Sequence, residues 1–174
     1  MTKKLSYILF FLLLLSSCTS SKYTAFSPSE KGKQEHVQKR KLKNKEVKKI
    51  LDYAYKFKGA PYKYAGATPK GFDCSGYVYY VFKNFNYILP KGSVNQSKVG
   101  RAVKRNHLQP GDLVFFAGQN ADSSQIGHVG IVVETYKDNR FKFIHASGRG
   151  VVEDWSTAKY WAQRYRKARR ILSE

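Results

Sequence analysis

The thiol of Cys74 is the side chain best placed to act as a nucleophile. It lies in the run Phe72-Asp73-Cys74-Ser75-Gly76, directly before apolar residues at helical spacing. Asp73 therefore stands where a helix N-cap is expected, and Cys74 falls in the first turn of that helix. Free backbone N–H groups and the positive end of the helix dipole favour a thiolate there. We expect the pKa of Cys74 to lie below its ordinary value of about 8.5.

Two of the four histidines are candidates for a proton acceptor beside this thiol. His128 and His145 belong to two predicted strands that a hairpin turn at residues 137–140 would join. On one face of that hairpin, His145 could orient His128 through a ring nitrogen, which would complete a set of nucleophile, base and orienting residue. The glycines that flank His128 leave space that a substrate could occupy. Spacing alone leaves open the alternative that both histidines only pack within their strands.

The first eighteen residues have the features of a bacterial export signal. Lys3 and Lys4 precede an apolar stretch, Leu5–Leu15, which is shorter than the roughly 20 residues of a membrane span. This stretch runs into Ser16-Ser17-Cys18, which resembles a lipobox, in which the cysteine is diacylated and becomes the mature N-terminus. We therefore expect a lipid anchor on Cys18; an ordinary signal peptide is the alternative. The protein would then lie on the outer membrane, facing the periplasm, or on the outer face of the cytoplasmic membrane.

The rest of the chain divides into a basic tether, residues 18–45, and one domain, residues 46–174. The tether has too few apolar residues to offset the entropy of ordering, so we expect it to be flexible. In the domain, predicted helices come first and predicted antiparallel strands follow, which indicates an α+β fold. The expected helices start near residues 46 and 74, with a partly helical segment at 155–165, and the expected strands are 113–116, 128–136, 141–146 and 151–152.

Five stretches, in this order, resemble the NlpC-type family of cell-wall cysteine peptidases. They are 59–66 (GAPYKYAG), 71–78 (GFDCSGYV), 108–116 (LQPGDLVFF), 127–131 (GHVGI) and 143–146 (FIHA). The resemblance implies a reduced papain-like α+β fold, with N-terminal helices packed on a small antiparallel sheet. It also implies hydrolysis of peptide bonds in peptidoglycan stem peptides, with Cys74 as nucleophile, His128 as base and His145 as the orienting third residue.

The same resemblance implies roles for residues around this set. Tyr62 matches a tyrosine beside the thiol that helps to stabilise an oxyanion. Three residues match positions near the substrate cleft: Asp73, Ser75 and Ser93. The chain departs from the family pattern at two positions of one loop. Lys91 stands where an arginine is common, which removes bidentate recognition of a carboxylate, and Gly92 stands where a small hydroxyl residue is common.

The net charge of +20, from 32 Lys and Arg against 12 Asp and Glu, predicts an anionic partner. Export argues against nucleic acid, and the segment 66–72 lacks the lysine of a phosphate-binding loop. We expect the charge to hold a monomeric protein against an anionic membrane or wall surface. No cofactor is expected, and no group of histidines, cysteines and carboxylates has the spacing of metal ligands.

The resemblance leaves the cleaved bond open. We favour opening of D-alanyl–diaminopimelate crosslinks over cleavage between γ-D-glutamate and diaminopimelate. The reason is that the family members that open crosslinks include lipoproteins without an added recognition domain. Two alternatives of another kind remain. One is a non-catalytic, wall-binding lipoprotein that keeps the fold, and the other is an amidase or transferase on the same scaffold.

Overall fold

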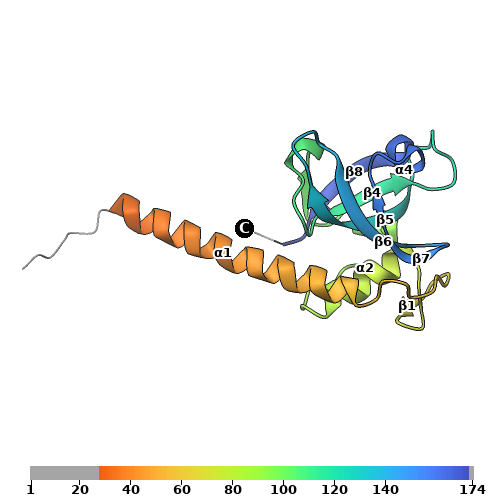
Figure 1. The fold of residues 1–174 in the computed structure, drawn as a ribbon, viewed down its shortest axis with the longest axis horizontal. Helices are drawn as coiled ribbons and strands as arrows, with labels where there is room; N and C mark the ends of the chain where they lie inside the picture. The colour runs from red at the N-terminus through yellow and green to blue at the C-terminus, as the bar shows by residue number, and fades with distance from the viewer. Residues whose placement is uncertain (1–27, 173–174) are drawn as a thin grey trace, which may run out of the picture.

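The computed structural model describes residues 28–172 (Figure 1). The expected export signal and Cys18 lie outside these residues. In chain order, the elements are α1 (Pro28–Tyr55), β1 (Ala67–Thr68), β2 (Gly71–Phe72), α2 (Cys74–Lys83), α3 (Ser93–Gln96), β3 (Arg101–Val103), the 3-10 turn η1 (Arg105–His107), β4 (Leu113–Ala117), β5 (Ile126–Thr135), β6 (Phe141–Ser147), β7 (Gly150–Trp155), α4 (Lys159–Arg164) and β8 (Tyr165–Arg170).

Helix α1 is 28 residues long, and its N-terminal part projects away from the rest of the protein (Figure 1). It includes residues 28–45, part of the segment expected to be a flexible tether; that part is helical instead. Lys, Gln and Glu are good helix formers, and a helix that is already nucleated extends without a second nucleation cost. Packing supplies the nucleus, because Ile50 and Ala54 of α1 are fully buried. No helix within residues 28–172 is long and apolar enough to cross a membrane.

Six strands form one antiparallel sheet in the order β3-β8-β4-β5-β6-β7. The predicted strands β4, β5, β6 and β7 are confirmed, as is the hairpin turn between β5 and β6. Strand β8, which lies between β3 and β4, was not expected. Its sequence, YRKARR, is basic and lacks the apolar alternation of a strand, so only pairing with its neighbours identifies it.

The sheet is covered by apolar side chains on both faces. On one face, α1 and α2 pack against side chains such as Leu113 and Phe115 of β4. On the other face, Trp161 of α4 packs with Val114 and Phe116 of the same strand. Side chains of a strand alternate between faces, so a strand covered on both sides is apolar throughout, as β4 is. The expected α+β fold is confirmed.

Candidate active site

Cys74 is the first residue of α2, as the sequence predicts. The carboxylate Oδ1 of Asp73 accepts hydrogen bonds from the backbone N–H of Gly76, at 2.6 Å, and from the hydroxyl of Ser75, at 2.9 Å. Asp73 is therefore the N-cap of the helix. The thiol is held beside β5, where the backbone N–H of Val129 interacts with the sulfur. Since Val129 follows His128, this contact brings the thiol next to the segment that carries the first candidate histidine.

The pKa of Cys74 differs from our expectation. Burial of the thiol and, second, the negative charge of Asp73 raise the pKa of Cys74 to about 11, although backbone N–H groups around the sulfur act to lower it. The helix terminus does stabilise the thiolate, but the loss of water around a buried sulfur outweighs that effect. At neutral pH the resting group is therefore a thiol.

His128 and His145 lie on the same face of the sheet and are joined directly. Nε2 of His128 is 2.9 Å from Nδ1 of His145. A β-bulge precedes His128, because Phe116 of β4 pairs with His128 whereas Ala117 pairs with Ile126. Bulges redirect side chains and are frequent beside active sites. The bulge and the hairpin register together bring the two rings into contact, so the expected juxtaposition of these histidines is correct.

Gly130 allows this arrangement in a way that the sequence did not indicate. A Cβ atom at position 130 would lie 2.6 Å from Cδ2 of Phe143 and 3.2 Å from Cβ of His145. The space beside Gly130 is thus filled by the neighbouring strand β6. Our expectation that this glycine leaves room for a substrate is wrong.

Asp154 of β7 extends the pair of histidines to a third side chain. Its Oδ2 lies 3.1 Å from Nε2 of His145 and accepts a hydrogen bond from the indole Nε1–H of Trp161 at 2.8 Å. Asp154 lies beyond the predicted strand at residues 151–152, so the sequence did not mark it as a site residue. Extending the period-two alternation from Val152 to 154 would have placed this carboxylate on the face that carries His145.

Both histidines are neutral at neutral pH. Burial and then the neighbouring His145 lower the pKa of His128 to about 3, against a smaller opposite effect of the Asp154 charge. Burial also lowers the pKa of His145, although its hydrogen bond to Asp154 opposes the shift. Burial acts to raise the pKa of Asp154, but the hydrogen bonds from His145 and Trp161, together with the charges nearby, outweigh it and lower the pKa, so the carboxylate is ionised.

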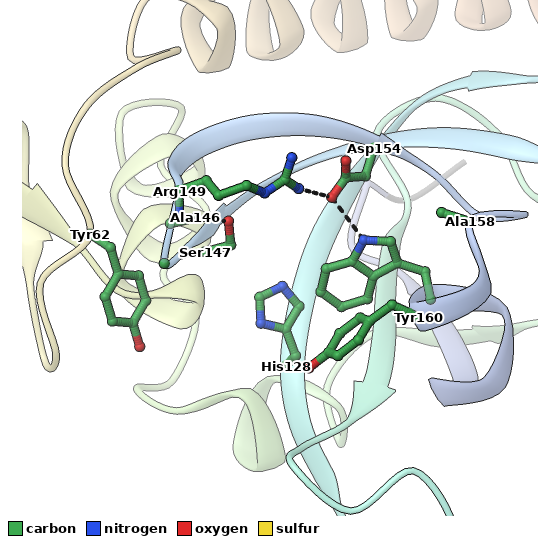
Figure 2. A pocket seen from close by; sticks show the side chains of 10 residues that line it. Tyr62, His128, Ala146, Ser147, Arg149, Asp154, Ala158 and Tyr160 are labelled. Atoms are coloured by element: carbon green, nitrogen blue, oxygen red, sulfur yellow. Dashed lines mark hydrogen bonds and ion pairs between the residues drawn. The ribbon is translucent and has the colours of Figure 1, made fainter.

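A pocket of about 530 Å³ opens over His128. Figure 2 shows Tyr62 on one side of His128, Tyr160 on the other, and Arg149 reaching toward Asp154. Residues of the β6–β7 turn and of the segment at α4 complete the lining: Ala146, Ser147, Gly148, Ala158 and Trp161. Nη2 of Arg149 lies 2.5 Å from Oδ2 of Asp154, and the Arg149 side chain is 64% exposed. No sequence motif marks Arg149, so its place in the pocket emerges only from the structure.

Tyr62 lies close to the thiol, as the resemblance implies. Its side chain is exposed to the pocket. Partial burial and then the nearby Cys74 and Asp73 raise the pKa of Tyr62. The hydroxyl therefore stays protonated at neutral pH and can donate a hydrogen bond to an oxyanion beside the sulfur.

The residues expected near a substrate cleft do not line this pocket. Asp73 and Ser75 are engaged in capping α2, and Ser93 is a buried residue at the start of α3. Gly92, which departs from the family pattern, has φ of +83°. Glycine adopts that backbone conformation without strain, whereas a residue with a side chain does not. The departure at Gly92 thus has a conformational reason.

A cysteine at the start of a helix, packed on an antiparallel sheet that supplies two adjacent histidines, defines a reduced papain-like α+β domain. The chain belongs to the NlpC/P60 family, whose model matches residues 59–170. Both the expected family and the expected fold are confirmed.

Similar proteins and structures support this assignment. The chain is 37% identical over 135 residues to Murein DD-endopeptidase MepS/Murein LD-carboxypeptidase of Escherichia coli strain K12, covering 76% of this chain and 67% of that protein. It is 38% identical over 125 residues to the probable endopeptidase NlpC of the same strain, covering 70% and 76%. A solved NlpC/P60 family protein from Bacillus cereus ATCC 10987 has a TM-score of 0.66 at 31% identity, covering 73% of this chain and 40% of that one.

Proposed function

We propose that this protein is a peptidoglycan hydrolase that cleaves peptide bonds of murein stem peptides or crosslinks. Cys74 is the nucleophile, His128 the general base and His145 the residue that orients His128. The observation that carries this proposal is the 2.9 Å contact between His128 of β5 and His145 of β6, beneath an open pocket, together with the contact of β5 with the thiol through Val129. The activity stated in the names of the E. coli relatives supports the same reaction.

The proposed reaction starts from a neutral thiol and a neutral imidazole. Nε2 of His128 is engaged with His145, so Nδ1 is the ring nitrogen available to the thiol. The sulfur attacks the peptide carbonyl carbon as Nδ1 takes the thiol proton. Collapse of the tetrahedral intermediate breaks the C–N bond, and His128 returns the proton to the leaving amine. Water, deprotonated by the same nitrogen, then hydrolyses the thioester and restores the thiol.

The developing negative charge on the carbonyl oxygen needs donors that are already in place. Backbone N–H groups at the start of α2 point to the region of the sulfur. The protonated Tyr62 hydroxyl lies on the same side, and its raised pKa keeps it a donor. We assign these groups to the oxyanion.

Arg149 is the candidate for recognition of the substrate's own charge. Murein stem peptides carry free carboxylates, and the guanidinium has five N–H donors. Among the described residues, only Nη2 of this side chain is engaged, with Asp154. The remaining donors line the pocket and suit a carboxylate held beside the bond to be cut. We continue to favour the D-alanyl–diaminopimelate crosslink as the bond cleaved.

We further propose that Cys18 carries a lipid anchor and that the protein acts in the cell envelope. The exposed basic residues of α1 would then lie against an anionic membrane or wall surface. Metabolic labelling with a radioactive fatty acid tests the anchor. Label should enter the wild-type chain and be lost in Cys18→Ser; label that persists in Cys18→Ser would contradict the assignment.

Digestion of purified peptidoglycan tests the reaction. The full chain, Cys74→Ala and His128→Ala are compared with the control His107→Ala, which removes an exposed imidazole that does not line the pocket. We expect the wild type and His107→Ala to convert crosslinked muropeptides to monomers, identified by mass spectrometry, and the other two variants to release nothing.

The products also separate the alternatives. New termini between γ-D-glutamate and diaminopimelate would show that this bond is cleaved and not the D-alanyl–diaminopimelate crosslink. Release of intact stem peptides from the sugar would indicate an amidase, and newly joined peptides a transferase. Binding to peptidoglycan without any product that depends on Cys74 would overturn the hydrolase proposal in favour of a wall-binding protein.

A further inference from the structure

We propose that Asp154 is a positioning residue that fixes the protons on both histidines and thereby leaves Nδ1 of His128 unprotonated. The inference rests on the proposed function, since it explains how His128 is kept ready as a base. It concerns a carboxylate that touches neither the thiol nor the reacting bond. Its evidence is a continuous chain of contacts from Asp154 to His145 and from His145 to His128.

The carboxylate of Asp154 determines which ring nitrogen of His145 carries a proton. An ionised carboxylate only accepts hydrogen bonds. Oδ2 of Asp154 accepts from the indole of Trp161 and from Arg149, and it lies 3.1 Å from Nε2 of His145. That ring nitrogen must therefore carry a proton, because an unprotonated nitrogen would set two acceptors against each other.

The proton on Nε2 of His145 in turn determines the tautomer of His128. A neutral imidazole with a proton on Nε2 has a lone pair on Nδ1. Nδ1 of His145 is thus an acceptor, and the contact of 2.9 Å requires Nε2 of His128 to be the donor. The neutral ring of His128 then has its lone pair on Nδ1, which is the nitrogen not used in the network. The opposite arrangement would leave a proton on Nδ1 and no base for the thiol.

The surrounding side chains also prevent a flip of the His145 ring that would exchange its two nitrogens. His145 is fully buried. Its ring stacks on Phe143 and lies edge-to-face with Trp161, with 4.8 Å between the ring centroids in each pair. Trp161 also donates to Asp154, so one side chain holds both the ring and the carboxylate. The position of each proton is consequently determined by packing as well as by hydrogen bonds.

The network also acts after proton transfer. When His128 accepts the thiol proton, its positive charge faces Nδ1 of His145, whose other nitrogen is bound to a fixed negative charge. An aspartate that holds a histidine in the productive tautomer and stabilises its cation has this effect in other hydrolases, where removing its charge lowers kcat by about 10⁴-fold. Asp154 acts through an intervening histidine, so we expect a smaller loss, on the order of 100-fold.

The experiment combines imidazole ¹⁵N NMR with kinetics on the full chain labelled at histidine. His36→Gln and His107→Gln assign the signals. In the wild type, both His128 and His145 should show a protonated Nε2 and an unprotonated Nδ1. Asp154→Ala should give mixed tautomers for both rings and lower kcat about 100-fold, with KM changed less than about threefold. Asp154→Asn keeps the shape of the side chain but removes its charge and can present an N–H donor to Nε2 of His145, so it should also shift the tautomers and lower kcat.

Glu153→Gln is the matched control, since Glu153 is the adjacent carboxylate of β7 and faces the other side of the sheet, toward Tyr55 and Lys142. It should change neither tautomers nor kcat. A wild-type His128 with its proton on Nδ1 would overturn the inference, as would Asp154→Ala with unchanged tautomers. The NMR result needs no turnover, so an inactive wild type would refute the proposed function while the tautomers still decide the role of Asp154.

Discussion

Nε2 of His128 and Nδ1 of His145 lie 2.9 Å apart, across two neighbouring strands of the sheet. Because both rings are neutral, this contact is a hydrogen bond between one donor and one acceptor, without repulsion between charges. It engages Nε2 of His128 with His145 and leaves Nδ1 as the nitrogen that our proposed mechanism uses. In the proposed mechanism, the resting geometry therefore decides which nitrogen of His128 takes the thiol proton.

The raised pKa of Cys74 predicts slow alkylation at neutral pH. With a pKa of about 11, about one thiol in 10⁴ is ionised at pH 7, and this fraction rises tenfold per pH unit. We expect the rate of inactivation by iodoacetamide to increase steadily from pH 6 to pH 9. A rate that levels off below pH 8 would show instead that the helix terminus dominates and that the resting group is a thiolate.

Acid should destabilise the fold through His128. Its pKa is about 3 in the folded protein and about 6.5 in the unfolded chain, so between these values the unfolded state binds more protons. The contribution of His128 to the free energy of unfolding is therefore complete above about pH 6.5 and is progressively lost as the pH decreases. From pH 7 to pH 5 we expect a loss of about 2 kcal/mol from His128.

Urea denaturation at the two pH values measures this loss. His128→Gln should reduce the dependence on pH, because the group that binds the extra proton is gone. His107→Gln, which replaces an exposed imidazole, should keep the wild-type dependence. Equal pH dependence in His128→Gln and the wild type would contradict the assignment.

Gly130→Ala should damage both stability and activity. The added methyl group would overlap Cδ2 of Phe143 and press on His145, so the strands must separate or the rings must move. Overpacking of this kind costs about 1–3 kcal/mol. Thermal unfolding and kcat check the effect. Gly32→Ala in α1, where a Cβ atom meets nothing within 4 Å, is the control and should not lower the melting temperature.

Tyr62→Phe should lower kcat about 10- to 100-fold with little change in KM, if its hydroxyl stabilises the oxyanion. Tyr64→Phe is the matched control, because Tyr64 lies in the same loop and is 87% exposed. Turnover of a soluble stem-peptide fragment measures both constants. An unchanged kcat in Tyr62→Phe would restrict the role of this tyrosine to packing at the rim of the pocket.

Arg149→Ala should raise KM about tenfold or more for a stem peptide with a free carboxylate, since a charge-assisted hydrogen bond contributes about 1.5–3 kcal/mol. Amidation of that carboxylate should remove the difference between variant and wild type. Arg140→Ala, at the exposed turn between β5 and β6, should leave KM unchanged. If amidation of the peptide changes KM by the same factor for Arg149→Ala and for the wild type, recognition of the carboxylate by Arg149 is refuted.

The sequence by itself determined the family and most of the fold. The N-cap before Cys74 and the apolar periodicity after it predict α2, and the alternating strands around residues 137–140 predict the hairpin that pairs His128 with His145. These are local patterns, in which residue type and spacing are enough. The motif stretches in their order likewise predict the family, which the match to residues 59–170 confirms.

The tertiary structure decided the electrostatics of the site and its lining. The pKa of Cys74 depends on how much water the fold removes, which no spacing encodes, and burial reversed the direction that the helix position predicted. Asp154 of β7 contacts His145, and Arg149 of the preceding turn and Trp161 of α4 contact Asp154. These contacts form only through strand register and packing. Local sequence cannot specify such contacts, because each depends on segments distant in the chain.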